Sequence, residues 1–333
     1  ASNCAPLTAT VGTTINVSNV DELSAAIQQA KENGNTTILL ADGTYNISDP
    51  YWINNSNIMI RSQSGDREKV IVRGAGMNGD VSHIFMLAGH NITVADMTVG
   101  WVANHAIQVH GEFDADNTIL HNLEVVDTFE QMIKISYSAD DQVNRSNDGI
   151  LECSTLSYSA GIGPQWYIGG IDGHFTKDWI VRDNIFMDII SPETDLAEHA
   201  VHFWSNAENT LVENNTIINC DRGVGFGLGD RGHIGGIIRN NNIYHKADGG
   251  DVGIGLENSS NTLVENNTIL LEGPYKNAIE YRFAGSKGIT IKNNATNKAI
   301  ISRDGGQATL EVNNLNAQVS DYANPALGDF TKL

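Results

Sequence analysis

Short stretches of alternating hydrophobic and polar residues recur along most of the chain. In each, two aliphatic or β-branched residues alternate with polar ones, usually next to asparagine. The copies are NIMIRSQ at 57, NITVADM at 91, NTILHNL at 117, NDGILEC at 147, DWIVRDN at 178, NTLVENN at 209, GGIIRNN at 235, NTLVENN at 261, GITIKNN at 288 and ATLEVNN at 308. Most copies start 20 to 34 residues apart, and those at 209, 235 and 261 are 26 apart. A repeat of this length indicates a solenoid of stacked coils.

The repeats contain strand-like alternation and no intervening helical pattern. They therefore predict an all-β, parallel β-helix of about ten coils rather than a leucine-rich horseshoe. Asparagine returns at one coil position, which predicts a ladder of stacked amides at a turn. Its members are Asn184, Asn215, Asn241, Asn267 and Asn294. We expect a single domain over residues 1–333, with no linker.

The two ends of the chain depart from the repeat. Residues 15–34 predict a short strand and then an amphipathic helix, with Ser18 or Asn19 as the N-cap and Gly34 after its end. The apolar face of this helix holds Leu23, Ile27 and Ala30. We expect the helix to cap the open end of the coil, which protects its strand edges from aggregation. The tail, residues 315–333, is irregular and is expected to fold over the other end.

Two stretches are longer than a coil requires, residues 137–168 and 190–198. On solenoids, insertions collect on the binding face. Both stretches adjoin the segment at 199–229, which combines a strand containing His199 and His202 with a glycine-rich strand. The sequence therefore predicts a functional face around this segment.

Alternation assigns an outward face to each strand preceding the asparagine phrase, and stacked strands lie about 4.8 Å apart. Two adjacent outward columns result. One contains Gln108, Lys134, Asp172, His202, Gly225, Gly255 and Glu280, and the other His110, Ser136, His174, Trp204, Gly227, Glu257, Arg282 and Arg303. The same alternation places His199 inward or at the rim.

These columns suggest a binding groove for an extended polymer. Glycines weaken a strand, so consecutive outward glycines suggest close approach by a ligand, and tryptophan is suited to stacking on a sugar ring. The expected substrate-binding residues are Gln108, His110, Asp172, Trp204, Gly225, Gly227, Glu257, Glu280, Arg282 and Arg303. Structural alternatives remain: the glycines could make room for the 190–198 loop, Trp204 could pack under a loop, and the Glu and Arg residues could form a surface ion-pair ladder.

The polar residues allow β-elimination of a uronic-acid polymer. In that reaction a base removes the C5 proton while a cation neutralises the carboxylate. Lys134 or His202 could be the base, His174 the acid for the leaving oxygen, and Arg222 or Arg282 the neutralising group. The candidate catalytic residues are therefore Lys134, His174, His202 and Arg222.

Other functions use the same face. A glycoside hydrolase needs two carboxylates, which could be Asp172 with Glu198 or Glu257. A C5-epimerase needs the same base and neutralising group as a lyase, with a second proton donor opposite. A non-catalytic glycan-binding or surface protein would use the β-helix only as a scaffold.

Composition narrows the choice of partner. The chain has 40 acidic and 20 basic residues and a net charge of −20, which argues against nucleic acid because phosphate binding requires a basic face. A polyanionic substrate would need local arginine, lysine or a metal cation. No run of about 18 apolar residues exists, so no membrane span is expected. We expect a monomer that is secreted or periplasmic, and the start at Ala1 suggests a removed leader.

Cysteine and metal chemistry stay open at this level. Cys4, Cys153 and Cys220 could form one disulfide and leave one free thiol, or all three could be unpaired. Oxygen ligands in the two long loops suggest Ca²⁺. The candidate ligands are Asp140, Asp141, Asp195 and Glu198. A zinc pair from His199 and His202 is not expected, because alternation puts them on opposite faces.

Several segments carry a family resemblance. VSNVDELSAAIQQAKENGNTTILLADGTYNI, near the start, resembles the N-terminal cap and first coil of alginate lyases and chondroitinase-B-type lyases. HAIQVHGE, GGIDGHFTKDWIVRDN, EHAVHFWSNAENTLVENN, RGVGFGLG and NAIEYRF are similar to secreted bacterial β-helix proteins, mostly of unassigned function. The chain thus resembles the right-handed parallel β-helix, pectate-lyase-like superfamily over nearly its whole length. The resemblance implies a carbohydrate-active enzyme, often Ca²⁺-assisted, for which Lys134 matches a lysine base on an outward strand.

Overall fold

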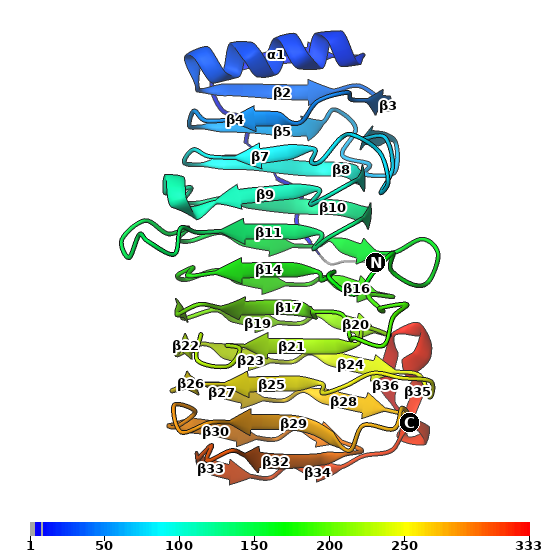
Figure 1. Ribbon diagram of the computed structural model, residues 1–333. Helices are drawn as coiled ribbons and strands as arrows, with labels where there is room; N and C mark the ends of the chain where they lie inside the picture. The colour runs from blue at the N-terminus through cyan, green and yellow to red at the C-terminus, as the bar shows by residue number, and fades with distance from the viewer. Residues whose placement is uncertain (1–3, 8) are drawn as a thin grey trace.

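The computed structural model describes residues 4–7 and 9–333, which form a parallel β-solenoid of about 11 turns. The coils stack along one axis beneath an N-terminal α-helix (Figure 1). The expected all-β, parallel β-helix fold is confirmed, with about one turn more than the repeats indicate. No helix in the described chain is long and apolar enough to cross a membrane.

A ten-stranded parallel sheet forms one side of the solenoid, with strand order β32-β29-β25-β21-β17-β14-β11-β9-β7-β4. Its strands are β4 (Tyr51–Ile53), β7 (Phe85–Leu87), β9 (Ile107–His110), β11 (Ile133–Ser136), β14 (Ile171–His174), β17 (His199–Trp204), β21 (Arg222–Phe226), β25 (Ile254–Glu257), β29 (Asn277–Arg282) and β32 (Ala299–Arg303).

A 21-stranded parallel sheet bends around the rest of the coil and contributes two strand segments to most turns. Its strands are β1 (Thr13–Val17), β2 (Thr36–Leu40), β3 (Gly43–Asn46), β5 (Ile58–Ser62), β6 (Val70–Arg73), β8 (Ile92–Val102), β10 (Ile119–Thr128), β12 (Ile150–Glu152), β13 (Thr155–Ser157), β15 (Ile180–Arg182), β16 (Ile185–Met187), β19 (Leu211–Glu213), β20 (Thr216–Ile218), β23 (Ile237–Arg239), β24 (Asn242–His245), β27 (Leu263–Glu265), β28 (Thr268–Leu271), β30 (Ile289–Lys292), β31 (Ala295–Thr296), β33 (Ala308–Val312) and β34 (Leu315–Asn316).

Smaller elements complete the chain. They are α1 (Val20–Asn33), the three-stranded sheet β18 (Ala207–Glu208), β22 (His233–Ile234) and β26 (Ser259–Ser260), the antiparallel pair β35 (Tyr322–Asn324) and β36 (Asp329–Lys332), and the 3₁₀ turns η1 (Gly111–Phe113), η2 (Val319–Asp321) and η3 (Pro325–Leu327).

The bend between the paired segments is built from consecutive polar residues. Asn214 and Asn240 take left-handed backbone conformations, with φ of 56° and 55°, which asparagine tolerates well. The next residue of each pair, Asn215 and Asn241, turns into the coil and is fully buried. Asn215 Nδ2 donates to Asn241 Oδ1 at 3.0 Å and to Val181 O at 2.9 Å. The same pattern joins Asn184, Asn215, Asn241, Asn267 and Asn294, so the expected ladder is confirmed.

The N-terminal helix caps the solenoid as expected. Asn19 is its N-cap and accepts the backbone N–H of Glu22 at 2.9 Å, while Gly34 follows its end with φ of 61°. The buried face contains Leu23, Ala26, Ile27 and Ala30. The helix therefore covers the first coil with its apolar stripe and leaves its polar face to solvent.

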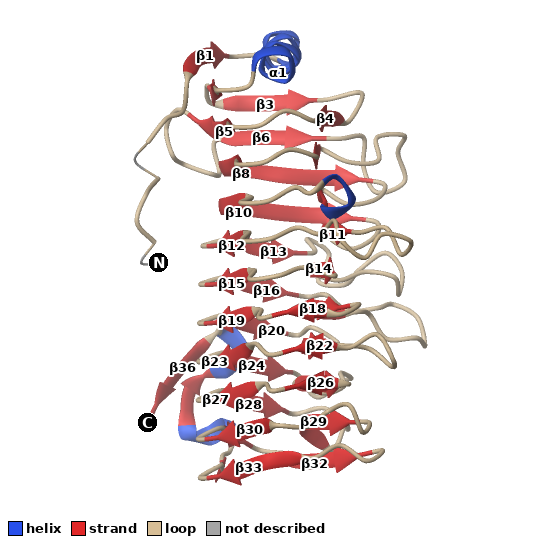
Figure 2. Ribbon diagram, turned by 90° about the vertical axis from the view of Figure 1, so that its left-hand side faces the viewer, coloured by secondary structure: helices blue, strands red, loops and turns tan. Residues whose placement is uncertain are grey.

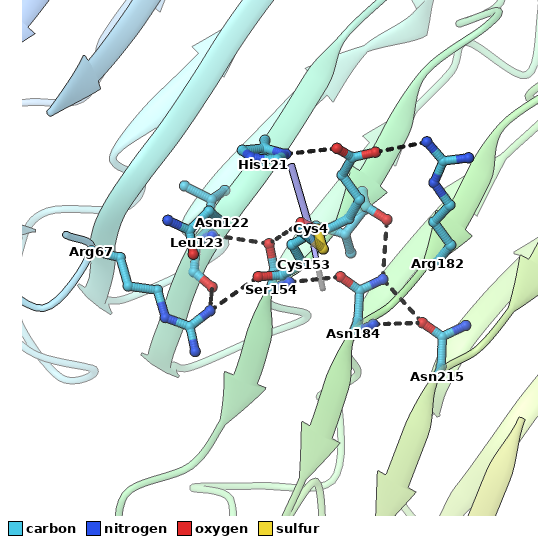
Figure 3. The surroundings of a disulfide bond; sticks show 12 residues. Cys4, Arg67, His121, Asn122, Leu123, Cys153, Ser154, Arg182, Asn184 and Asn215 are labelled. Carbon is cyan, nitrogen blue, oxygen red and sulfur yellow. Dashed lines mark hydrogen bonds and ion pairs between the residues drawn. A yellow bond between two sulfur atoms is a disulfide. The ribbon is translucent and has the colours of Figure 1, made fainter. Parts of the chain in front are cut away.

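Residues 4–7 and 9–12 lie along the flank of the solenoid (Figure 2), and a disulfide joins Cys4 to Cys153 (Figure 3). Cys220 is buried and unpaired. Around the disulfide, His121 Nδ1 lies 2.6 Å from Glu152 Oε2, and Arg182 donates to Glu152 Oε1 at 3.1 Å. Of the open cysteine alternatives, the structure thus has one disulfide and one free thiol.

The C-terminal tail differs from expectation. It turns back along the side of the solenoid instead of closing its end (Figure 2). Tyr322, from β35, and Ala317 pack in one apolar cluster with Ile218, Tyr244 and Leu270, which belong to three successive coils. The reason is that these strands carry outward apolar side chains, which the tail removes from water.

The expected 137–168 loop is also wrong as a single unit. It contains β12 and β13, which pair with β10 and continue the 21-stranded sheet. Two loops remain, 137–149 and 158–170. The 190–198 loop is confirmed, and Asp221 Oδ2 accepts the N–H groups of Ser191 and Ala197 at 2.9 Å each. This carboxylate fixes both ends of the loop and therefore the start of β17.

Candidate functional site

Strand register confirms the first outward column on the ten-stranded sheet and three separate parts of the second. Gln108, Lys134, Asp172, His202, Gly225, Gly255 and Glu280 pair in succession. In the second column, Ser136 pairs with His110, His174 with Trp204, and Arg282 with both Glu257 and Arg303. Insertions of unequal length therefore leave the stacking of the strands intact.

Asp172 is the centre of the first polar cluster. Its Oδ2 lies 2.5 Å from Lys134 Nζ, and its Oδ1 accepts the Trp204 indole N–H at 2.7 Å. Burial would raise the pKa of Asp172, but Lys134 and the neighbouring histidines hold it well below its usual range. Burial would likewise lower the pKa of Lys134, yet Asp172 raises it. The pair is therefore a buried carboxylate and ammonium, which opposes the role of Lys134 as a base.

His174 lies in an aromatic and cationic cage. Its ring stacks on Tyr137 with centroids 5.2 Å apart, and its Nδ1 is 2.9 Å from Ser205 Oγ and 3.3 Å from an Arg231 nitrogen. Its Nε2 faces Asp172 at 3.5 Å. Burial lowers its pKa, so the ring is neutral, with each nitrogen facing a polar partner.

Trp204 does not offer a free face for sugar stacking in this structure. One face stacks on His202, with centroids 4.8 Å apart and planes 11° apart. The Arg231 guanidinium lies over the ring at 4.1 Å. The indole therefore orders Asp172 and His202, which fits the packing alternative, and its role in binding sugar stays a prediction.

His199 corrects the expectation from alternation. It opens β17 and its ring lies on the outer face, 4.4 Å from the His202 ring centroid to centroid. A Cβ added to Gly225 would lie 2.6 Å from the His199 ring, and one at Gly255 would lie 3.9 Å from its Nε2. The first residue of a strand follows a loop, so its side chain is free of the alternation that holds Val201 and Phe203 in the core.

His202 is completely buried between two carboxylates. Its Nε2–H donates to Gly227 O at 3.1 Å, while its Nδ1 lies 3.3 Å from Glu198 Oε2 and 3.6 Å from Asp172 Oδ1. Burial opposes the charged form, but these carboxylates raise the pKa of His202. Its remaining ring nitrogen is enclosed, which does not suit a base that must meet substrate.

A cavity of about 160 Å³ opens beside His199, toward the C-terminal coils. Its lining is His199, Arg222, Leu228, Asp251, Val252, Gly255, Leu256, Glu257, Tyr275, Glu280, Arg282 and Arg303. The structure therefore gathers five residues suggested by the sequence, Arg222, Glu257, Glu280, Arg282 and Arg303, around one hollow.

The cavity walls carry paired charges. Arg222 Nε lies 3.1 Å from Asp251 Oδ2, Arg282 Nε 2.8 Å from Asp304 Oδ2, and Arg303 2.8 Å from Glu280 Oε2. Tyr275 donates to Glu280, and burial together with that carboxylate raises the pKa of Tyr275. Each guanidinium has five N–H donors, more than one such carboxylate uses, so the arginines keep capacity for a bound anion.

Glycine is required for different structural reasons at neighbouring positions in and next to β21 and β25. Gly225 and Gly255 leave room for the His199 ring, whereas a Cβ at Gly223 or Gly253 would meet core isoleucines, so those two do not face outward. Gly227 has φ of 78°, and a Cβ there would overlap Glu257 O. Backbone geometry therefore accounts for Gly227, independently of any substrate.

Gln108 and His110 lie nearer the N-terminus on the same face. Gln108 Oε1 accepts from His83 Nε2 at 2.8 Å. His110 Nδ1 contacts Glu112, which also accepts from Ser136 at 2.8 Å, and Trp52 packs edge-on against the His110 ring. These two residues belong to a separate polar cluster outside the cavity.

The expected calcium ligands do not converge. Among the described residues, the groups close enough to share an ion include Glu198 but not Asp140, Asp141 or Asp195. Asp141 instead accepts the N–H groups of Val143 and Asn144 at 2.8 and 3.0 Å within its own loop. This donor set does not fit a shared Ca²⁺ site, and a calcium requirement stays a prediction.

The sequence pattern did not single out three residues of the site, Tyr275, Arg231 and Asp251. Tyr275 lies in a connection between strands and Arg231 in the turn after Gly229, where alternation assigns no direction. Asp251 likewise precedes β25. In the sequence these residues stand out only by lying close to outward strand positions, and ordinary loop residues do so too.

Comparison with solved structures supports the fold. The alginate lyase from Paenibacillus sp. str. FPU-7 is 15% identical, with a TM-score of 0.58 over 92% of this chain and 99% of that chain. Pectate lyase Pel9A is 14% identical, with a TM-score of 0.59 over 89% and 76%. The A-module of the Azotobacter vinelandii mannuronan C-5 epimerase AlgE6 is 12% identical, with a TM-score of 0.51 over 89% and 93%.

These likenesses show the pectate-lyase-like parallel β-helix fold. No protein-family model matches the sequence, and no curated protein matches it either.

Proposed function

We propose that the protein is a polysaccharide lyase that cleaves a uronic-acid-containing glycan by β-elimination. Similar folds occur in proteins named as alginate lyase, pectate lyase and mannuronan epimerase, which supports a carbohydrate-active protein. The observation that carries the proposal is the cavity beside His199, because three arginines and a tyrosine line it together.

Arg222 and Arg282 are the proposed carboxylate-binding groups. Binding the uronate carboxylate to guanidinium groups makes the adjacent C5 proton more acidic, because negative charge that develops on the carboxylate is stabilised. Arg303 extends the cationic wall. Its partner Glu280 is already occupied by Tyr275 and Asn277, so that carboxylate repels a substrate less than a free one would.

Tyr275 is the proposed proton donor to the leaving oxygen. Its pKa is raised by burial and by Glu280, so the phenol keeps its proton at neutral pH. The proton acceptor at C5 would then lie across the cavity, at the end where His199 covers Gly225. Lys134, His174 and His202 are not assigned this role in the proposal, because none of them lines the cavity. They order the wall behind His199.

Hydrolysis is less well supported. Glu257 and Glu280 both line the cavity, but Glu257 accepts the Gly229 N–H at 3.2 Å and Glu280 is held by Tyr275 and Arg303. A hydrolase needs one carboxyl group that is protonated and one that is free to act as base or nucleophile. Burial raises the pKa of Glu280 but its hydrogen bonds outweigh this and lower it, which opposes an acid role.

The disulfide bears on location. A Cys4–Cys153 disulfide is expected in an oxidising compartment, so it supports a secreted or periplasmic protein. We propose that the protein acts there as a monomer on an extracellular polymer.

The decisive experiment exposes purified protein to alginate, pectate, glucuronan and chondroitin, and follows ultraviolet absorbance of the unsaturated product together with new reducing ends. Elimination raises both. We expect Arg222→Ala to lower kcat/KM by about 100- to 1,000-fold, the scale of losing one charge-stabilising group. Arg239→Ala is the matched control, since Arg239 pairs with Glu213 on the other sheet and should leave activity unchanged.

Other results would select the other functions. Reducing ends without absorbance indicate a hydrolase, and inversion of uronate configuration without cleavage indicates an epimerase. Binding of a glycan with no chemical change indicates a non-catalytic protein. Each of these outcomes overturns the lyase proposal.

A further inference from the structure

Three side chains that converge at the end of the cavity form a ligand set. Glu198, His199 and His202 each offer one ligand atom, and these atoms all lie within 4.8 Å of one another. His199 and His202 are 5% and 0% exposed, yet the Nδ1 atom of each ring has no hydrogen-bond partner in the described chain. A buried polar nitrogen without a partner is unfavourable and needs an explanation.

The geometry of His202 is that of a metal ligand. Because Gly227 O can only accept, His202 Nε2 must carry a hydrogen, so Nδ1 is the nitrogen of this ring that can give up a proton and bind a metal ion. Histidines that bind metals usually donate their other N–H to a carbonyl or carboxylate in this way. Glu198 Oε2 is 3.3 Å from this Nδ1 but outside hydrogen-bond alignment.

The charges around the group leave room for a cation. Of the two carboxylates beside His202, Asp172 is paired with Lys134. Among the described residues, no lysine or arginine lies within ion-pair distance of Glu198, whose neighbour within that distance is His202. A divalent ion held by Glu198 and the two imidazoles would balance this carboxylate and give each buried ring a polar partner.

We propose that Glu198, His199 and His202 bind a divalent transition-metal ion of the zinc class. Two imidazoles and one carboxylate suit zinc, nickel, copper or iron, whereas calcium requires more oxygen ligands. Three protein ligands leave a coordination position open, as catalytic sites do. His199 and Arg222 line the same cavity, so these residues would hold the ion next to the place where Arg222 would bind a carboxylate.

The role of the ion in catalysis rests on the proposed β-elimination, whereas the site itself does not. Such ions lower the pKa of bound water to about 7. Held by Glu198, His199 and His202, such an ion would supply the base that accepts the C5 proton. The electron pair of the broken C5–H bond would form the C4=C5 double bond. The C4–O bond then breaks, and the leaving oxygen takes the proton of Tyr275, which solvent restores.

The test is metal binding by the full chain, independent of activity. Protein stripped with a chelator is titrated with Co²⁺ and followed by its visible absorption, and Zn²⁺ content is measured after gel filtration. We expect one ion per chain and a metal-dependent rise in melting temperature. Glu198→Gln and His199→Ala should weaken binding by more than the roughly 10- to 100-fold typical of losing an outer-shell partner.

The matched control is His90→Ala. His90 belongs to another histidine–carboxylate group, with Asp114 and Asp116, so it tests whether that group is the real site. The proposed site would be overturned if H90A lost metal binding, or if E198Q and H199A bound metal as well as wild type. It would also be overturned if wild type bound no metal, in which case the group holds only a proton on His202. E198Q is nearly isosteric, so its melting temperature without metal checks folding.

The two proposals fail separately. If chelator-stripped wild-type protein cannot bind Co²⁺ but still catalyses elimination, the metal-site proposal is wrong and the lyase proposal stands. If the wild-type protein binds one ion that E198Q does not bind, and no uronic-acid polymer is cleaved by elimination, the metal-site proposal stands and the lyase proposal is wrong.

Discussion

Lys134 and Asp172 form an ion pair between neighbouring strands, with Nζ 2.5 Å from Oδ2 and side chains that are only 13% and 3% exposed. Two unit charges are thus held on the outer face of the coil but away from water. The loop residue Tyr137 packs against His174 beside this pair, and Trp204 donates to the same carboxylate. The pair therefore has the energetics of a buried contact, although its strand positions point outward.

Removing one member of the pair should destabilise the protein. Lys134→Met or Asp172→Asn leaves the remaining partner without its counterpart, which costs about 3–5 kcal/mol for a buried pair. Denaturant unfolding of each variant checks this value. The double variant K134M/D172N should lose less than the sum of the singles, because no uncompensated charge remains.

The exposed pair of Lys69 and Asp66, with side chains 60% and 44% exposed, supplies the control. Lys69→Met should change the free energy of unfolding by less than about 0.5 kcal/mol. Equal effects of K134M and K69M would contradict the view that burial decides the energetics of the pair.

The asparagine ladder gives a second prediction. Asn241→Ala leaves Val212 O and the Asn215 backbone N–H without the partners that Asn241 provides, at 3.0 and 3.1 Å in the structure. A buried group left unpaired costs about 1–3 kcal/mol, so N241A should lower the free energy of unfolding by at least that amount. Asn240→Gly is the adjacent control, because glycine accepts its left-handed backbone. A larger loss in N240G than in N241A would show that the turn, and not the ladder, stabilises the coil.

Sequence pattern predicts what is periodic in this protein. The outward columns and the ladder follow from periods of 2 and about 26 residues, since neither depends on loop conformation. His199 was misplaced because it is the first residue after a loop. Tyr275 lies in a connection, and the Cys4–Cys153 pairing joins residues 149 positions apart. Such features depend on tertiary contacts, which alternation does not encode.

Acid should weaken the contact beside the disulfide. A hydrogen bond from His121 is the largest cause that lowers the pKa of Glu152; burial opposes it and Arg182 assists. A lowered folded-state pKa contributes stability above the unfolded value of about 4.3, and this contribution is lost as pH falls through the folded value. The stability difference between wild type and Glu152→Gln should therefore shrink below that pH. Melting curves across the acid range measure it, with the exposed Glu68→Gln as control. A constant difference at all pH values would contradict this account.

The glycine beneath His199 gives the sharpest test of the site. A Cβ at Gly225 would lie 2.6 Å from His199 Cδ2 and Nε2, so Gly225→Ala must displace the imidazole. At Gly255 the nearest contact would be 3.3 Å, to Val252 Cγ1, and His199 would be 3.9 Å away. Misplacing a catalytic group by about 1 Å can lower the rate about 100-fold. We therefore expect G225A to lose Co²⁺ binding and lyase activity together, while G255A keeps Co²⁺ binding.

Both substitutions add one methyl group to the same column on adjacent strands, so a general effect on the sheet should appear in both variants alike. Melting temperatures and circular dichroism establish that each variant is folded. If G225A kept full activity and unchanged metal affinity, the position of the His199 ring over Gly225 would have no part in function. The cavity would then have to act through its arginines alone.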